Sequence, residues 1–147
     1  MTIVSQLLRT KGNDIWSVSP DTTIFDALKL MSQMNVGAVL VLQEGEVAGI
    51  FSERDYARKV VLHGKSSRTT PVKEAMTANV ICVSPKESIE TCMTMMSDRH
   101  FRHLPVKSEE GELMGIISIG DVVKALLAKQ EGIINHSCYA QIARRLT

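Results

Sequence analysis

The chain contains the same unit twice, and this repetition constrains the fold more than any other feature of the sequence. Residues 18–24 read VSPDTTI, and residues 83–89 read VSPKESI. Residues 45–55 read GEVAGIFSERD, and residues 111–121 read GELMGIISIGD, so a Gly-x-x-Ser-x-x-Asp motif also occurs twice. Self-similarity at one spacing indicates duplicated supersecondary units, here of about 50 residues each. We therefore expect two copies of one small unit, joined by a linker.

The two copies show the same order of predicted elements: an extended segment, a helix, two strands and a second helix. Apolar residues at helical spacing begin at Ile24 and at Ile89. Thr22 or Thr23 and Ser88 are the candidate N-caps. Apolar segments joined by glycine-bearing turns predict one hairpin in each copy. The predicted extended segments are 14–18 and 79–83, the strands are 38–43, 46–51, 103–108 and 112–117, and the second helices are 53–64 and 119–132.

The polar, proline-bearing stretch 65–75 indicates a linker, with one short turn at 71–76. It separates repeat one, residues 10–64, from repeat two, residues 76–130. The tail at 131–147 has spaced apolar residues that predict a final amphipathic helix. A unit with three strands and two helices cannot cover both faces of its own sheet. We therefore expect a mixed α/β (α+β) fold, in which two pseudo-symmetric repeats pack sheet to sheet and leave clefts between them.

Charge, hydropathy and cysteine content exclude several classes of protein. The net charge is +1, so no basic field predicts a nucleic-acid partner. No apolar run approaches the roughly 20 residues of a membrane-spanning helix, and the first residues lack the pattern of a signal peptide. Cys82, Cys92 and Cys138 form no Cys-x-x-Cys motif, which favours free thiols in a reducing compartment. We expect a cytoplasmic protein that has no membrane partner.

The repeated Gly-x-x-Ser-x-x-Asp motif has two readings. Ser52 and Ser118 fall where a strand gives way to a helix, and an acid three residues later forms a variant of the capping box. Asp55 and Asp121 also place negative charge in the first helical turn, where the helix dipole favours it. The other reading is a ligand site, because an ionised aspartate accepts through two oxygens and can take both hydroxyls of a ribose. The glycine before each serine allows a close approach to the backbone.

The order of the motifs resembles that of a CBS-domain pair, a module first described in cystathionine β-synthase, from residue 10 to residue 130. The segments that carry the resemblance are SPDTTIFDALKLM, NVGAVLV, GIFSERDYARKV, EAMT, RHLPV and GIISIGDVVK. They look most like the stand-alone bacterial type, in which no enzyme or transporter is attached to the pair.

The resemblance implies that the protein binds an adenine nucleotide such as AMP, ATP or NAD. In such pairs the aspartate of each motif holds the ribose, which implicates Asp55 and Asp121, with Ser52 and Ser118 close by. Backbone and apolar groups contact the adenine, and arginine suits the phosphates because its planar fork donates two hydrogen bonds. The other residues that the resemblance places at the ligand are Val18, Gly37, Ala38 and Arg54 in repeat one, and Ile81, Val83, Arg102, His103, Leu104 and Pro105 in repeat two.

The two copies differ at positions that the resemblance places near the ligand. Residues 37–38 are Gly-Ala, whereas the corresponding residues 102–103 are Arg-His. Residues 53–54 are Glu-Arg, whereas residues 119–120 are Ile-Gly. We therefore expect the two sites to differ in affinity or in ligand, for example one mononucleotide and one larger nucleotide such as NAD.

Together these features predict a regulatory sensor rather than an enzyme, without a catalytic cofactor or a metal, that acts as a homodimer on an unidentified effector protein. None of the usual nucleophile, phosphate-loop or metalloprotease motifs occurs. The alternative is a protein-interaction scaffold that binds no nucleotide in cells. A third reading is a small hydrolase or redox protein that uses Cys138 beside His136, although two ligands are too few for a zinc site.

For three other sets of residues we prefer a structural interpretation to a functional one. Cys82 and Cys92 lie in apolar segments and are expected to be buried, and Arg99 and His100 are expected on the surface. Methionines at helical spacing predict packing between helices, with an adaptable partner surface as the alternative. These methionines are Met31, Met34, Met93, Met95 and Met96.

Overall fold

The computed structural model describes residues 2–128, which form two compact units. Residues 15–80 make up the first-repeat unit, and residues 2–14 together with 81–128 make up the second-repeat unit. Each unit therefore includes the segment that precedes the other repeat in the sequence. The predicted tail helix, His136 and Cys138 lie outside the described residues, and the predicted domain boundaries stay a prediction.

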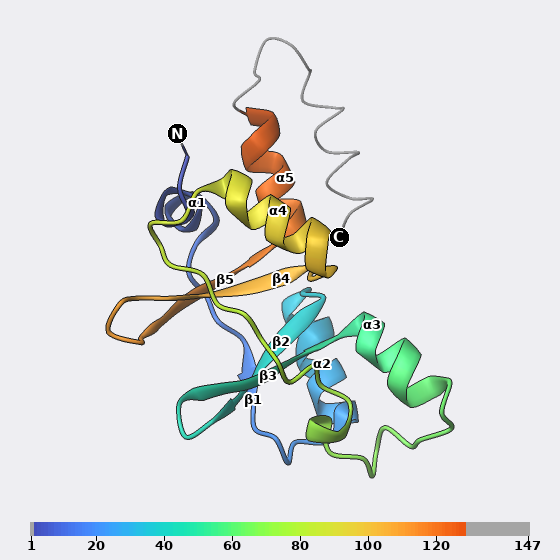
Figure 1. Cartoon of the computed structure of the whole chain (residues 1–147). Helices are drawn as coiled ribbons and strands as arrows, with labels where there is room; N and C mark the ends of the chain where they lie inside the picture. The colour runs from blue at the N-terminus through green and yellow to red at the C-terminus, as the bar shows by residue number, and fades with distance from the viewer. Residues whose placement is uncertain (1, 129–147) are drawn as a thin grey trace. The chain divides into compact units, whose positions relative to one another are not determined.

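The first-repeat unit is built around a three-stranded sheet in the order β1-β2-β3 (Figure 1). β1 runs parallel to β2, and β3 runs antiparallel to it. The helix α2 packs against β2. The elements are β1 (Ser17–Val18), α2 (Ile24–Met34), β2 (Ala38–Gln43), β3 (Glu46–Ser52), α3 (Glu53–Asp55), the π-helix η1 (Tyr56–Val61) and the 3₁₀ turn η2 (Val72–Glu74).

Local sequence accounts for most of these boundaries. The Thr23 hydroxyl accepts the amide of Asp26 over 3.2 Å, so Thr23 rather than Thr22 is the N-cap of α2. Glu44 and Gly45 connect β2 to β3 with φ angles of 52° and 82°. Positive φ at both positions is the requirement of a tight hairpin turn, and glycine meets it without steric cost.

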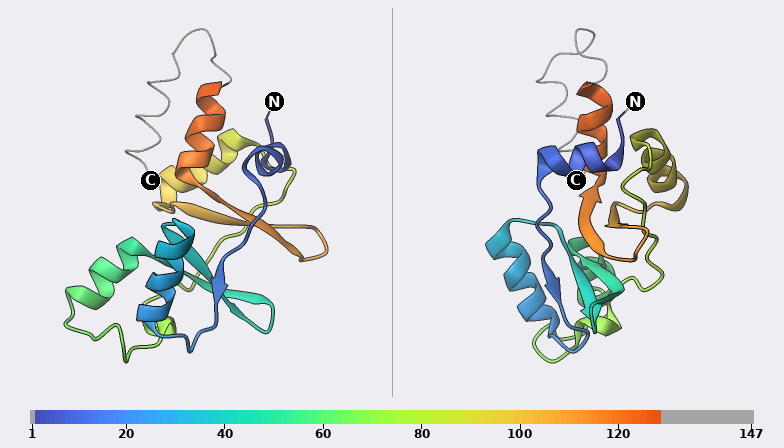
Figure 2. Two further views of the ribbon diagram at one scale, coloured as in Figure 1. Left: turned by 180° about the vertical axis from the view of Figure 1, so that it is seen from behind. Right: turned by 90° about the vertical axis from the view of Figure 1, so that its left-hand side faces the viewer.

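The second-repeat unit pairs a two-stranded antiparallel sheet with three helices. The helix α5 packs against both α4 and α1, and the three helices lie on the hairpin β4–β5 in both views of Figure 2. Ser88 is the N-cap of α4, as predicted, and accepts the amide of Thr91 over 3.1 Å. The elements are α1 (Val4–Lys11), α4 (Ile89–Arg99), β4 (His103–Lys107), β5 (Leu113–Ser118) and α5 (Ile119–Ala128).

The sequence patterns do not predict α1, which supplies part of the core of the second-repeat unit. Val4 is fully buried, and Leu7 and Leu8 are 7% and 6% exposed. The turn η2 likewise supplies part of the core of the first-repeat unit, through Val72 and the adjoining Ala75. Burying one such aliphatic side chain stabilises a fold by about 1.5–3 kcal/mol, so each short segment matters to its unit.

The extended segment predicted at 79–83 does not form a strand, which corrects the expected element order of repeat two. In repeat one the Leu40 amide donates to the preceding extended segment, and β1 joins the sheet. Pro105 takes the place of Leu40 in the repeated hairpin, and proline has no amide hydrogen to donate. Among the described residues the segment keeps one isolated bridge, from Val83 to Val106.

The helix predicted at 53–64 is α-helical for one turn and then winds as the π-helix η1, which is a second correction. In this wider winding Lys59 lies against the Asp55 carboxylate, while Val60 is fully buried. The helix stops before Gly64, as predicted, where φ is 68°. Both corrections fall next to residues of the candidate site.

Candidate functional site

Both copies of the motif form a capping box at the junction of a strand and a helix. The Asp55 amide donates to the Ser52 hydroxyl over 3.2 Å, and the Ser52 amide donates back to Asp55 Oδ2 over 2.9 Å. The same pair of bonds joins Asp121 and Ser118, at 3.1 and 2.8 Å. The capping reading of the motif is therefore confirmed, and it holds each aspartate in one orientation.

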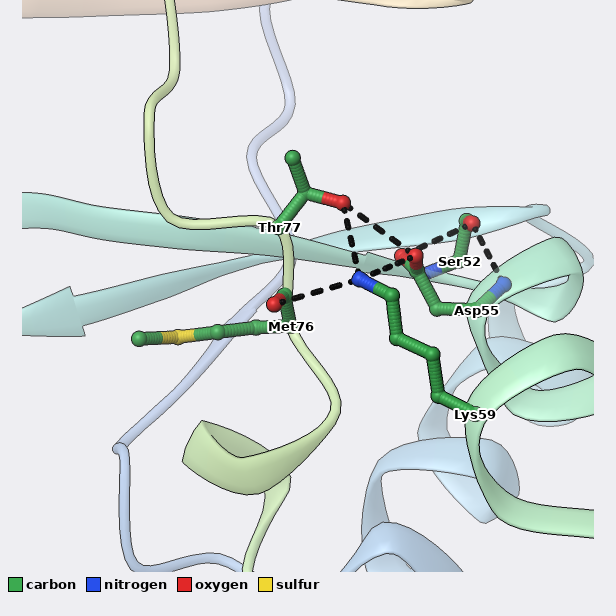
Figure 3. A network of polar contacts seen from close by, with 5 residues as sticks. All are labelled: Ser52, Asp55, Lys59, Met76 and Thr77. Atoms are coloured by element: carbon green, nitrogen blue, oxygen red, sulfur yellow. Dashed lines mark hydrogen bonds and ion pairs between the residues drawn. The ribbon is translucent and has the colours of Figure 1, made fainter. Parts of the chain in front are cut away.

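The carboxylate of Asp55 is buried and surrounded by donors (Figure 3). Besides the Ser52 amide, Oδ2 accepts the Ser52 hydroxyl over 3.0 Å. Oδ1 accepts the Thr77 hydroxyl over 3.2 Å and lies 3.1 Å from Lys59 Nζ. Lys59 in turn reaches the carbonyl of Met76 over 3.4 Å. The side chain of Asp55 therefore joins the start of α3 to the helix that follows it and to the segment after η2.

The carboxylate of Asp121 has a different set of partners. Oδ2 accepts both the Ser118 amide and the ammonium of Lys11, the last residue of α1. The same ammonium donates to the carbonyl of Ile116 on β5. No hydrogen bond or ion pair from the described part of the chain reaches Oδ1, and the side chain is 22% exposed, against 12% for Asp55.

The motif glycines allow these neighbouring segments to lie close to the sheet. A Cβ on Gly49 would meet the sulfur of Met76 and the carbonyl oxygen of Thr77 at 2.7 Å. A Cβ on Gly115 would meet Leu8 Cδ2 at 2.9 Å. The close approach predicted at these glycines is therefore made by the chain itself.

The other predicted residues of repeat one lie at the adjoining ends of β2 and β3. Ala38 pairs with Ser52 in the strand register. The amide of Glu53 donates to the carbonyl of Gly37 over 3.1 Å. Arg54 is exposed on α3, directly before Asp55 in the sequence.

Repeat two repeats this arrangement with different side chains. His103 pairs with Ser118, and Leu104 pairs with Ile117. The amide of Ile119 donates to the carbonyl of Arg102 over 2.8 Å. Arg102 is exposed and His103 is half-buried, whereas Gly and Ala occupy these positions in repeat one. The two strand starts therefore differ in the polar side chains that they carry.

The residues expected near an adenine ring lie along the extended segments. Val18 is in β1, and the Trp16 carbonyl before it accepts an amide of β2. In the second-repeat unit the Val83 amide donates to the Pro105 carbonyl over 2.9 Å. Ile81 is half-buried and lies outside the strands. The structure thus brings the predicted residues together within each unit, while their contact with a nucleotide stays a prediction.

Sequence reasoning missed Lys11, Lys59 and Thr77, which complete the two networks. Lys59 follows Asp55 by four residues, a spacing that places an acid and a base side by side on a helix. Thr77 and Lys11 are 22 and 110 residues away from the aspartates they contact, so no local pattern could have shown them.

The thiols in the described part of the chain are suited to a core rather than to catalysis. Cys92 is fully buried, and burial, with Glu87 nearby, raises the pKa of its thiol to about 11. Cys82 is half-buried rather than buried; burial raises the pKa of its thiol, which Lys107 partly opposes. Within residues 2–128 no three His, Cys, Asp or Glu side chains group as a metal site would need.

The remaining clusters divide between core and surface. Met31 and Met96 are almost fully buried, as expected for packing residues, whereas Met34 is 38% exposed. Arg99 and His100 are exposed, as predicted. No described helix is long and apolar enough to cross a membrane.

Comparison with known proteins agrees with this geometry. The CBS domain family model matches residues 4–62 and again residues 72–128. The chain belongs to the CBS-domain family. The two matches confirm the predicted pair of CBS repeats and its mixed α+β fold, and each match begins in one of the short segments, α1 or η2, that pack on the other repeat.

Two relatives show how far the similarity extends. The chain is 40% identical over 136 residues to the mitochondrial CBS domain-containing protein CBSX3 of Arabidopsis thaliana, which covers 86% of this chain and 65% of CBSX3. This chain therefore spans slightly less than two thirds of that protein. The solved structure of a protein with CBS domains from Burkholderia ambifaria MC40-6 is 45% identical with a TM-score of 0.84, and the match covers 91% of this chain and 100% of that one.

A more distant CBS-domain structure shares the fold and was solved with a ligand. It is CBSX2 in complex with AMP, which is 24% identical with a TM-score of 0.68 over 89% of this chain and 100% of that chain. At this level of identity the likeness supports the fold of this chain.

Proposed function

We propose that this protein is a regulatory module that binds adenine nucleotides, with the ribose held by the aspartate of a Gly-x-x-Ser-x-x-Asp motif. The observation that carries the proposal is the carboxylate of Asp121, which is fixed by the capping box and whose Oδ1 receives no hydrogen bond or ion pair from the described residues. An ionised carboxylate offers about four acceptor positions, and the cis-hydroxyls of a ribose are two donors.

The family adds support from a related protein. CBSX2 has been solved with AMP, an adenine nucleotide with a ribose. In this chain Arg54 lies on α3 within the first motif, and Arg102 and His103 lie at the start of β4, next to the second motif; we expect these three residues to meet the phosphates. A signal would then arise if the two packing states of the protein differ in nucleotide affinity, because a ligand shifts an equilibrium only by that difference.

The second candidate is a protein-interaction scaffold that binds no nucleotide in cells. It is favoured by the carboxylate of Asp55, which is fully provided with donors from its own unit. Under that reading both motifs serve capping and packing alone. The homodimer, the effector protein and the choice between AMP, ATP and NAD all remain predictions.

A thermal-shift screen separates these candidates. The full chain is melted with AMP, ADP, ATP, NAD, NADH or S-adenosylmethionine, and a nucleotide present at 100 times its Kd stabilises the folded state by about 2.7 kcal/mol. Asp121→Asn should weaken the affinity for any nucleotide found by about tenfold, the equivalent of 1.4 kcal/mol.

Glu110→Gln is the matched control, because Glu110 is an exposed acid in the β4–β5 turn, at the end of the hairpin opposite Ser118, and its loss should leave affinity unchanged. The scaffold reading is supported if no adenine compound shifts the melting temperature.

A further inference from the structure

We infer that the two repeats are not equivalent as ribose sites: repeat two is open to ligand, whereas Lys59 and Thr77 hold the carboxylate of repeat one closed. This inference rests on the proposed function and adds which repeat binds first and which side chains decide it. It goes beyond the difference at Arg54 and Gly120, because it concerns the ribose-holding group itself.

The closed state of repeat one follows from the donors around Asp55 (Figure 3). The amide and hydroxyl of Ser52 donate to Oδ2, the hydroxyl of Thr77 donates to Oδ1, and Lys59 Nζ lies 3.1 Å from Oδ1. These donors are four, and a carboxylate has about four acceptor positions. A ribose could bind there only after contacts to Asp55 have broken.

The open state of repeat two follows from the same comparison. Asp121 receives two donors from the described residues, the amide of Ser118 and the ammonium of Lys11, and both reach Oδ2. The hydroxyl of Ser118 accepts from the Asp121 amide, and no bond from it to the carboxylate is formed. Two acceptor positions therefore remain, which is the number of hydroxyls in a ribose cis-diol.

The residues that close repeat one are held in place by the rest of their unit. The backbone of Thr77 forms a two-way bridge with Ile50 of β3, with bonds of 2.8 and 3.0 Å. Lys59 also lies 3.4 Å from both the Met76 carbonyl and the Thr77 hydroxyl. The strand β3, which leads into the motif, therefore also positions Thr77, the residue that would compete with a ribose for Asp55. The closed state forms without any ligand.

Calorimetric titration of the full chain with AMP tests this inference. Wild-type protein should bind one AMP tightly and a second at least about tenfold more weakly, if at all. Asp121→Asn should weaken the tight site by about tenfold, and Asp55→Asn should leave its affinity unchanged. The double variant Lys59→Met/Thr77→Val leaves Asp55 with two donors, as Asp121 has, and should tighten the weak site by about tenfold or more.

Three controls separate competition from a loosened fold. Lys73→Met removes a lysine of the same unit that pairs with Asp21, and should change neither affinity. 2′-Deoxyadenosine monophosphate lacks one hydroxyl of the diol, so preference for AMP over this probe should appear at the weak site only when the site has been opened. Thr77→Val alone, with a smaller gain, serves if the double variant does not fold.

The possible results are distinct. Two equal sites in the wild type, a tight site lost with Asp55→Asn, or a weak site unchanged in the opened variants would overturn the inference while nucleotide binding stands. Absence of binding by AMP and by every other adenine compound of the thermal-shift screen, in both the wild type and the opened variants, would overturn the proposed function and the inference together.

Discussion

At the scale of single residues, each position of the Gly-x-x-Ser-x-x-Asp motif has a separate physical task. The glycine lets a neighbouring segment pack on the strand, and the serine caps the helix. The aspartate returns a bond to the serine amide and also captures a lysine, Lys59 or Lys11. The motif is therefore kept intact by the fold itself, before any ligand is considered.

The glycines offer a matched pair of substitutions. A Cβ at Gly49 would strike the backbone oxygen of Thr77, which cannot move without shifting the bridge to Ile50. A Cβ at Gly115 would strike the end of the flexible Leu8 side chain. We predict that Gly49→Ala lowers the free energy of unfolding in urea by about 1–3 kcal/mol, while Gly115→Ala changes it by less than about 1 kcal/mol. Equal losses at both positions would contradict this account of the close approach.

At the scale of elements, the repeats diverge where one residue changes the hydrogen bonds of the backbone. Leu40 and Pro105 occupy the same place in the two hairpins, facing Ile50 and Ile116. The proline removes one donor, and the strand that precedes the helix in repeat one is reduced to a bridge in repeat two.

Restoring the donor should restore the strand. We predict that Pro105→Val lets the new amide donate to the carbonyl of Ile81, as the amide of Leu40 does to the carbonyl of Trp16 over 3.0 Å. Hydrogen exchange measured by NMR should then show a protected amide at position 105. An amide that exchanges as fast as those of the exposed loops would show that other features keep residues 79–83 out of the sheet.

At the scale of the whole molecule, the order of the sequence is not the order of packing. Val4 precedes repeat one but is fully buried in the core of the second-repeat unit. Val72 precedes repeat two but is fully buried in the core of the first-repeat unit. A substitution at Val4 should therefore destabilise the second-repeat unit, and a substitution at Val72 should destabilise the first-repeat unit.

Hydrogen exchange measured by mass spectrometry can test which unit each segment stabilises. Val4→Ala should reduce the protection of residues 81–128, and Val72→Ala should reduce that of residues 15–80. The expected local loss for either truncation is up to about 1.5–3 kcal/mol, the value of burying such a side chain. A loss of protection in residues 15–80 for Val4→Ala, and in residues 81–128 for Val72→Ala, would contradict this prediction.

The duplication, the hairpins, the helices α2, α4 and α5 and the two capping boxes could be predicted from the sequence, because each depends on residues a few positions apart, whereas α1 and the π-helical winding of η1 could not. Thr23, Ser88, Gly45 and Gly64 show this, since each ends or begins an element through its own side chain or φ angle. The family could also be named from the order of the motifs. The absence of a strand at 79–83 was not predicted, because it depends on the missing amide hydrogen of Pro105, which lies in another element.

The tertiary structure decided which distant donors reach the two carboxylates. The motif is the same in both repeats, so the sequence by itself determined where Asp55 and Asp121 lie and how each caps its helix. Which donors fill them depends on Thr77 and Lys11, which reach the motifs from 22 and 110 residues away. Contacts at such separations follow from the packing of whole segments, and no local pattern records them. That packing makes two identical motifs into one closed and one open acceptor.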